Sequence, residues 1–115
     1  MRFSHSLKEN HLFRRLYSRG SSAANRCLVL YCRKNGSETN RIGLTVSKKL
    51  GHAVTRNRVR RRLREIYRLN EERFAAGYDI VVVARSRACE ASFSELTAAY
   101  LALAKRLGLL RTEDI

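Results

Sequence analysis

The sequence predicts an α+β fold, a two-layer sandwich of helices packed on a small central sheet. The first observation is the order of segments, because stretches with helical periodicity and short apolar runs follow one another as helix, strand, strand, helix, strand, helix. The second is residues 79–84, an almost continuous apolar run typical of a strand buried on both faces in a central or parallel position. The third is the length of 115 residues, which suits a single domain spanning 1–115.

The N-terminal half is predicted to form one helix and two strands. Residues 9–18 have helical periodicity, and Gly20 is placed to end the helix. Its apolar face consists of Leu12, Phe13, Leu16 and Tyr17. Residues 27–33 form an almost continuous apolar run, and Asn35-Gly36 marks a chain reversal before the second strand, residues 41–47. That strand alternates, with one face formed by Ile42, Leu44 and Val46 and the other by Arg41, Gly43, Thr45 and Ser47.

The C-terminal half is predicted to form a long helix, the buried strand and a last helix. Thr55 is a suitable N-cap for a helix over residues 56–72. The apolar stripe of this helix consists of Val59, Leu63, Ile66 and Phe74. A capping box formed by Ser92 and Glu95 opens the last helix, which ends near Gly108. The apolar face of the last helix consists of Phe93, Leu96, Tyr100, Leu103 and Leu107.

The net charge of the chain is its strongest functional signal. Lys and Arg together number 24 against 10 acidic residues, which gives a net charge of +14. Such an excess destabilises a compact chain by self-repulsion unless an anionic partner relieves it, so nucleic acid, an acidic membrane surface and acidic proteins are candidate partners. Most of the cations are arginine, whose planar guanidinium matches phosphate oxygens. The composition therefore favours phosphate recognition.

Neither a membrane segment nor an export signal is expected. No apolar run approaches the roughly 20 residues that a membrane span requires, and the N-terminal segment has no apolar stretch long enough for a signal peptide. We therefore expect a cytoplasmic protein. Cys27, Cys32 and Cys89 form no C-x-x-C pair and no zinc-binding spacing, so we expect them to be reduced structural thiols.

Positive charge is concentrated in residues 48–68, which contain nine basic residues and one acid, Glu65. On a helix, the positions opposite or beside the apolar stripe include Arg58, Arg60, Arg61, Arg62, Arg64 and Arg68. A solvated charged face is the simpler interpretation, but such a face usually mixes signs. Here like charges recur four residues apart and repel by a few tenths of a kcal/mol per pair, so we infer that the helix binds an anion.

A second candidate surface lies on the face of residues 41–47 that carries small side chains and hydroxyls. Tyr31 on the neighbouring strand, with Phe13 and Tyr17 on the first helix, is expected to line a groove beside it. Aromatic rings next to hydroxyls and positive charge suit an unpaired nucleic-acid strand, whose bases stack on the rings. The alternative, which spacing alone slightly favours, is that Phe13 and Tyr17 belong to the core.

The motif around Arg56-Asn57-Arg58 carries a resemblance to a known family. It is preceded by Ser47-Lys-Lys-Leu-Gly51 and followed by Arg60, Arg61 and Arg64. With these residues the chain resembles the protein subunit of bacterial ribonuclease P. Four other segments also fit the family's pattern: the first helix, the strand that follows Ala24-Asn-Arg26, residues 41–49 and residues 78–85. The resemblance therefore covers roughly residues 6–107. Tyr17 is a departure, because phenylalanine is as readily expected there; tyrosine keeps the ring and adds a hydroxyl.

This resemblance implies a domain similar to the second domain of ribosomal protein S5, with a left-handed β-α-β crossover from residues 41–47 through the arginine-rich helix to residues 79–84. It implies an RNA-binding subunit whose partner, a catalytic RNA that uses Mg²⁺, removes the 5′ leader of precursor tRNA. The residues expected to face RNA, with Arg68 included from the charge pattern, are Lys48, Lys49, Arg56, Asn57, Arg58, Arg60, Arg61, Arg62, Arg64 and Arg68. Those expected to line the leader cleft are Phe13, Tyr17, Val29, Tyr31, Thr45 and Ser47.

The side chains themselves are not expected to catalyse cleavage or to bind a metal. The acidic residues are scattered, and none lies between Glu38 and Glu65, where the positive charge is concentrated. Only His52 among the histidines adjoins the basic segment, and a phosphate contact is preferred there over a catalytic base. A structural ribosomal RNA-binding protein is the alternative function. A DNA reader is disfavoured, because only Asn57 among the arginines offers a base-edge contact.

Overall fold

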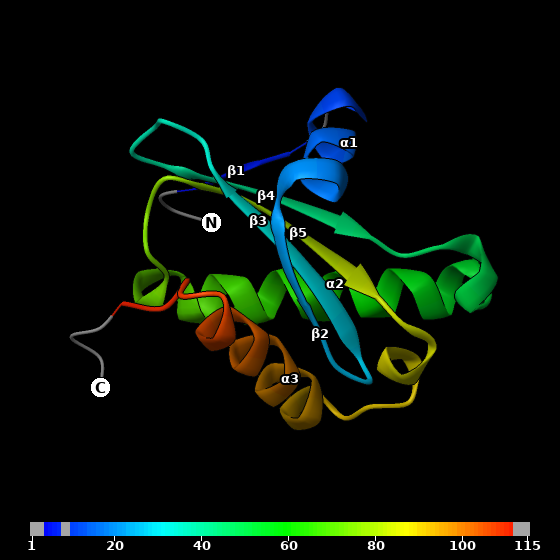
Figure 1. The fold of residues 1–115 in the computed structure, drawn as a ribbon. Helices are drawn as coiled ribbons and strands as arrows, with labels where there is room; N and C mark the ends of the chain where they lie inside the picture. Colours follow the sequence, from blue (N-terminus) through cyan, green and yellow to red (C-terminus); the bar gives the residue numbers. More distant parts are fainter. Residues whose placement is uncertain (1–3, 8–9, 112–115) are drawn as a thin grey trace.

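The described residues form one five-stranded sheet with three helices packed on it (Figure 1), and the computed structural model describes residues 4–7 and 10–111. The strands are β1 (Ser4–Ser6), β2 (Ser21–Ala24), β3 (Leu28–Lys34), β4 (Asn40–Thr45) and β5 (Tyr78–Ala84). The helices are α1 (Asn10–Arg19), α2 (Ala53–Asn70) and α3 (Phe93–Arg106). The short 3₁₀ turns are η1 (Lys48–Leu50), η2 (Glu71–Arg73) and η3 (Ser86–Cys89). The predicted α+β class is confirmed.

The strand order is β1-β4-β5-β3-β2, so β5 is the central strand. It pairs parallel with β4 and antiparallel with β3, as its apolar sequence predicts. Helix α2 connects β4 to β5 and lies behind the sheet in Figure 1; this crossover is left-handed, against the usual right-handed preference. The chain reverses at Asn35-Gly36, where Gly36 has a φ of 73°, but β3 and β4 do not pair because β5 lies between them.

Two short edge strands have no clear signal in the sequence. β1 pairs parallel with β4, and β2 pairs antiparallel with β3. The sequence of β2 is Ser-Ser-Ala-Ala, which contains none of the β-branched or aromatic side chains that favour strands. Pairing with a longer, buried neighbour therefore decides the conformation of this segment, and local propensity does not.

The two faces of the sheet are covered by different helices. α2 and α3 pack on one face, where Leu63, Ile66 and Leu103 are fully buried. α1 packs on the other face through Leu16, which contacts Val81 of β5 in a smaller cluster. Within the described part of the chain, no helix combines the length and the apolar character that a membrane span requires.

Helix α2 begins earlier than the sequence predicts. It starts at Ala53 after His52, so Thr55 lies inside the helix and is not its N-cap. The backbone N–H of Arg56 donates to the carbonyl of His52 at 3.0 Å, which closes the first turn without a side-chain cap. The prediction that Thr55 is the N-cap was wrong, because a suitable capping side chain does not by itself determine where a helix starts.

Other boundaries also differ from the prediction. Phe74 follows η2 and is buried in the core, but it is not on the α2 stripe, where Tyr67 is buried instead. β4 ends at Thr45, so Val46 and Ser47 lie beyond the strand. The predicted start of the first helix, Glu9, lies outside the described residues.

Helix α3 begins with the predicted capping box. The backbone N–H of Glu95 donates to Ser92 Oγ at 3.1 Å, and the backbone N–H of Ser92 donates to the Glu95 carboxylate at 3.0 Å. The hydrogen bonds from Ser92 hold the pKa of Glu95 below its ordinary value. Leu96 and Leu103 are fully buried as predicted, whereas Phe93 in the first turn is 37% exposed and lies outside the core.

Candidate nucleic-acid interface

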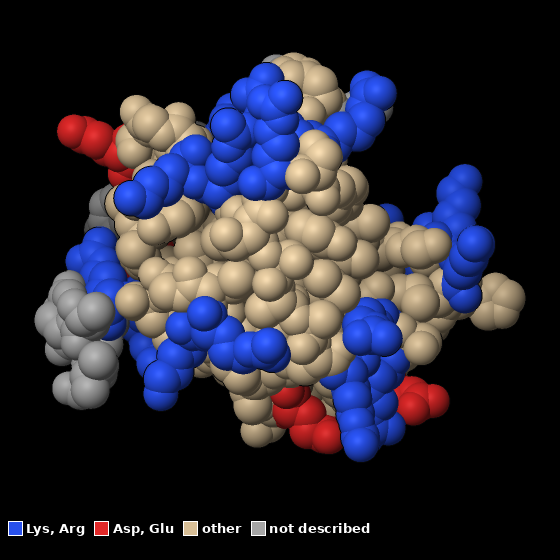
Figure 2. All heavy atoms as spheres, in the orientation of Figure 1, with Lys and Arg blue, Asp and Glu red and all other residues tan. Residues whose placement is uncertain are grey.

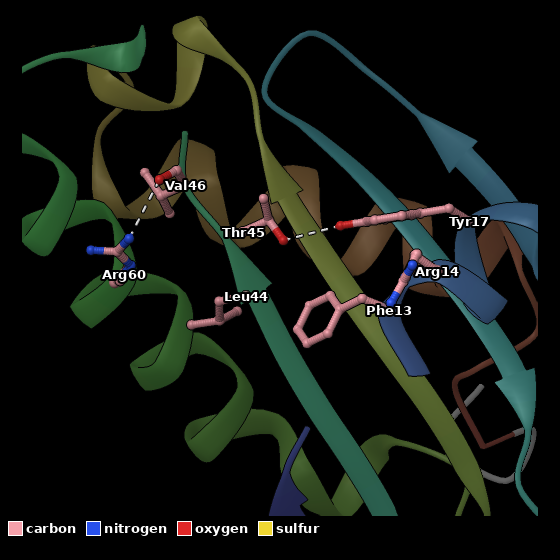
Figure 3. Close-up of a pocket in the computed structure, with 7 residues that line it drawn as sticks. All are labelled: Phe13, Arg14, Tyr17, Leu44, Thr45, Val46 and Arg60. Carbon is pink, nitrogen blue, oxygen red and sulfur yellow. Dashed lines mark hydrogen bonds between the residues drawn. The ribbon is translucent and has the colours of Figure 1, made fainter. Parts of the chain in front are cut away.

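An open groove of about 710 Å³ lies between α1 and α2, across β4 (Figure 3). Its lining residues are Phe13, Arg14, Tyr17, Leu44, Thr45, Val46 and Arg60. In Figure 3, Arg60 lies on one side of the groove and Arg14 on the other, with Thr45 between them. A guanidinium group therefore stands on each side of a partly apolar floor.

The groove crosses an edge of the sheet. β1 pairs with β4 only from Asn40 to Ile42, so residues 43–45 of β4 extend beyond β1 as an edge. Helices α1 and α2 lie on opposite faces of the sheet, and the groove joins these faces around that edge. The short length of β1 thus leaves room for a ligand beside Thr45.

Phe13 lines the groove and is also anchored in the fold. A Cβ atom at Gly43 would lie 2.6 Å from Cζ of Phe13, closer than Cβ atoms approach non-bonded neighbours, so the Phe13 ring occupies space that glycine leaves free. The ring packs against the small cluster that contains Leu16 and Val81. Phe13 therefore belongs both to the cleft and to the core.

Tyr17 is 42% exposed and lies at the surface of the groove, so the core interpretation of this residue is wrong. Its hydroxyl oxygen is 3.1 Å from Thr45 Oγ1, and either group can be the donor. Its ring meets Tyr31 edge-on, with centroids 4.9 Å apart and an interplanar angle of 73°. Because the ring is held at two points, little rotamer entropy remains to be lost when a base stacks on it.

The remaining predicted cleft residues, Val29, Tyr31 and Ser47, are not among those that line this groove. Val29 and Tyr31 share one face of β3, and both are half-buried. Ser47 is exposed, and its hydroxyl accepts a hydrogen bond from the backbone N–H of Lys49 at 3.2 Å. Ser47 therefore caps η1, and its contact with a leader stays a prediction.

The predicted charged surface of α2 is exposed. Arg61 and Arg64 are solvent-accessible, and within the described residues neither side chain makes a hydrogen bond or an ion pair. Arg60 turns toward the groove, where it donates to the carbonyl of Val46 at 3.4 Å and to Asn57 Oδ1 at 3.2 Å. One helix thus presents guanidinium groups both to the groove and to the outer surface.

The segment that leads into α2 adds further exposed polar groups. Lys48 and Lys49 of η1 are exposed, as is His52 at the start of the helix. Arg56 donates to the carbonyl of Gly51 at 3.2 Å. These cations and the Arg61/Arg64 surface belong to one continuous stretch of chain.

Besides Arg56 and Arg60, three more of the predicted RNA-binding arginines have partners within the protein. Arg58 donates to the carbonyl of Cys89 at 3.1 Å, and Arg62 donates to the carbonyl of Ala91 at 3.1 Å. Arg68 is paired with Glu65, which raises the pKa of Arg68. Arg58 and Arg62 therefore fasten the segment before α3 to α2. A guanidinium has five N–H donors, so these contacts leave donors free for an anion.

Arg14 is a groove residue that the sequence interpretation missed. It follows Phe13 directly and lies about 60° from Tyr17 around a helix axis, so the helical spacing contained this signal. Leu44 and Val46 were expected to face only the core. They also line the groove, because among the described residues no strand pairs with β4 beyond Ile42 on the side away from β5.

The groove contains none of the described acidic side chains. Within residues 4–7 and 10–111, no three His, Cys, Asp or Glu side chains are grouped so that they could hold a metal ion. Cys27, Cys32 and Cys89 are free thiols, and burial raises the pKa of Cys32. The groups presented here are cations, hydroxyls and aromatic rings, which can bind and orient an anionic strand.

Comparison with known proteins identifies the family. The family model described as Ribonuclease P matches residues 1–108. The ribonuclease P protein component of Alkaliphilus oremlandii is 44% identical over 112 residues, covering 97% of this chain and 98% of the relative. That of Clostridioides difficile is 48% identical over 101 residues, covering 87% and 89%.

Solved structures agree with the sequence relatives. The structure of the Staphylococcus aureus RNase P protein superimposes with a TM-score of 0.86 at 33% identity, covering 94% of this chain and 99% of the other. The RNase P protein from Thermotoga maritima gives a TM-score of 0.82 at 34% identity, covering 89% and 96%. A family match over nearly the whole chain, close relatives and the shared fold lead to one conclusion: the chain belongs to the ribonuclease P protein family.

Proposed function

We propose that the protein is the RNA-binding subunit of a ribonuclease P ribonucleoprotein and assists removal of the 5′ leader from precursor tRNA. It thereby forms part of an endoribonuclease complex, and its own side chains bind RNA. The observation that carries this proposal is the groove with Arg14 on one side and Arg60 on the other, which holds the exposed ring of Tyr17 and adjoins the arginine surface of α2.

Two binding roles follow from this arrangement. The exposed outer surface of α2, with Arg61 and Arg64, would contact the phosphates of the catalytic RNA, because guanidinium groups match phosphate oxygens. The groove would hold the unpaired leader, whose bases can stack on Tyr17 while Thr45 offers a hydroxyl. Phe13 forms part of the wall of the groove and is held in place because its ring packs against Gly43.

The cleavage chemistry would belong to the RNA partner. Phosphodiester hydrolysis with metal ions uses carboxylate or phosphate oxygens as ligands, and the donors gathered at this interface are cations and hydroxyls. The RNA and its Mg²⁺ would activate the attacking water, and the protein would neutralise phosphate repulsion and position the leader.

Reconstitution tests this proposal. Protein freed of RNA should leave precursor tRNA intact at every magnesium concentration. Added to the catalytic RNA, it should raise cleavage efficiency, most strongly at low magnesium, where protein cations replace missing counterions. Cleavage by a verified RNA-free preparation, lost in His52→Ala, would establish a protein enzyme instead. Recovery of ribosomal RNA alone with the protein from cells would favour the structural ribosomal alternative.

A further inference from the structure

The outer surface of α1 carries three arginines that the groove only partly explains. Arg14, Arg15 and Arg19 are exposed, and the helix contains no acidic residue. Within the described residues, none of the three side chains makes a hydrogen bond or an ion pair. Figure 2 shows the resulting concentration of positive charge over α1. We call these three residues the α1 arginine face.

The intrinsic stability of α1 does not account for all three residues. Arg19 lies in the last turn, where a cation is favoured by the helix dipole. Arg15 is four residues before Arg19, and like charges at this spacing repel by a few tenths of a kcal/mol. Arg14 and Arg15 are far from the helix C-terminus and gain little from the dipole. An anionic partner would relieve the repulsion.

The α1 arginine face is continuous with the groove. Arg14 belongs to both, since it lines the groove beside Phe13. Arg15 lies about 100° around the helix from Arg14 and about 160° from Tyr17, so Arg15 and Arg19 occupy the flank of α1 opposite the groove, and Arg14 lies on the outer surface between the two flanks. A strand that leaves the groove past Arg14 therefore reaches Arg15 next.

The arginine surface of α2 lies on the other side of the sheet. α2 packs on the face opposite to α1, and Arg61 and Arg64 point away from that buried stripe. One RNA segment lying on the outer side of α2 does not reach Arg15 without wrapping around the sheet edge. The two basic helices are thus placed to hold different RNA segments.

We propose that the α1 arginine face binds the phosphate backbone of the 5′ leader upstream of the nucleotides that occupy the groove. α1 then holds the substrate, and the outer surface of α2 holds the catalytic RNA. This inference rests on the proposed function, because it extends the path of the leader beyond the groove.

The test compares two precursor tRNAs in the complex assembled with catalytic RNA. One carries a short leader that ends within the groove. The other carries a longer leader that extends beyond the groove to the α1 arginine face. The variant is Arg15→Gln with Arg19→Gln. The matched control is Arg73→Gln with Lys105→Gln, which removes the same charge from exposed residues next to α2 and in α3.

Wild type should bind the long-leader precursor more tightly than the short one. The α1 variant should lose about 2- to 30-fold in affinity for the long-leader precursor, the range for two exposed ion pairs. Its slope of log affinity against log salt should become shallower by about 0.7 for each phosphate contact removed. Short-leader precursor, mature tRNA and the catalytic RNA should bind with unchanged affinity, and the control variant should match wild type.

Several outcomes would overturn the inference alone. In the first, the α1 variant still binds the long-leader precursor more tightly than the short-leader precursor, by the same factor as wild type. In the second, the control variant loses as much affinity for the long-leader precursor as the α1 variant does. In the third, the α1 variant loses affinity for the catalytic RNA, while its preference for the long leader is unchanged. Equal affinity of wild type for precursor and mature tRNA would instead overturn leader binding itself, and with it this inference.

Discussion

The two faces of the sheet differ in how completely they are covered. On the face under α2 and α3, β3 buries Leu28 and Leu30 completely. On the α1 face of the same strand, Val29 and Tyr31 remain half-buried. Figure 2 looks onto this side and shows an uncharged centre with mostly Lys and Arg around it, and acidic side chains only at the upper left and along the lower edge. Alternate residues of one strand are thus buried in the core and left partly accessible on the α1 face.

The two faces of the sheet place different demands on their side chains. The covered face needs shape and apolar volume, because its side chains exchange water for close packing. The open face tolerates exposed rings such as Tyr17 because each is held by specific contacts, here Thr45 and Tyr31. Substitutions should therefore affect stability on one face and RNA affinity on the other.

The largest effect is expected on the outer surface of α2. Reversing Arg61 and Arg64 to Glu should weaken binding of the catalytic RNA by orders of magnitude, because attraction to phosphate is replaced by repulsion. Both side chains are exposed, so the circular-dichroism spectrum should remain native. Unchanged affinity in a folded variant would remove this surface from the interface.

A matched pair of truncations tests the division between the faces. Leu63→Ala on α2 should lower the free energy of unfolding by about 2–5 kcal/mol, because a fully buried leucine leaves a cavity. Leu12→Ala on α1 should lower it less, because Leu12 is only half-buried in the smaller cluster. Urea unfolding measures both values, and equal losses would contradict the difference in packing.

The smallest effect is expected from the Tyr17–Thr45 hydrogen bond. Tyr17→Phe keeps the ring and should weaken precursor binding by about 0.5–1.5 kcal/mol, the usual net value of one hydrogen bond. Thr45→Val should cause a similar loss, and the double variant should lose no more than either single variant. Additive losses in precursor affinity would show that the two hydroxyls act separately.

Local signals in the sequence predicted local structure well. The capping box of Ser92 and Glu95 depends on four consecutive residues and formed as predicted. The apolar run of β5 indicated a central strand, because burial on both faces leaves no polar alternation. Tyr17 and Thr45 were recognised as possible neighbours from the pattern of rings and hydroxyls, and the structure brings them together.

Features that depend on distant segments could not be predicted in the same way. The insertion of β5 between β3 and β4 is a long-range pairing with no local signature. The hydrogen bonds of Arg58 and Arg62 depend on where the segment after η3 lies, which a helical projection does not contain. The groove itself exists because β1 stops at Ser6, and three residues of strand give too little pattern to detect.

The most direct test of leader binding on the open face is the affinity ratio of precursor to mature tRNA in Tyr31→Ala. Tyr31 is half-buried and supports the Tyr17 ring from β3, so its loss should remove a stacking surface without a large cavity. The assembled complex should bind precursor tRNA more weakly by about 1–3 kcal/mol and mature tRNA with unchanged affinity, so the ratio should fall. An unchanged ratio in a folded variant would contradict the account, because the rings would then support the fold and not the leader.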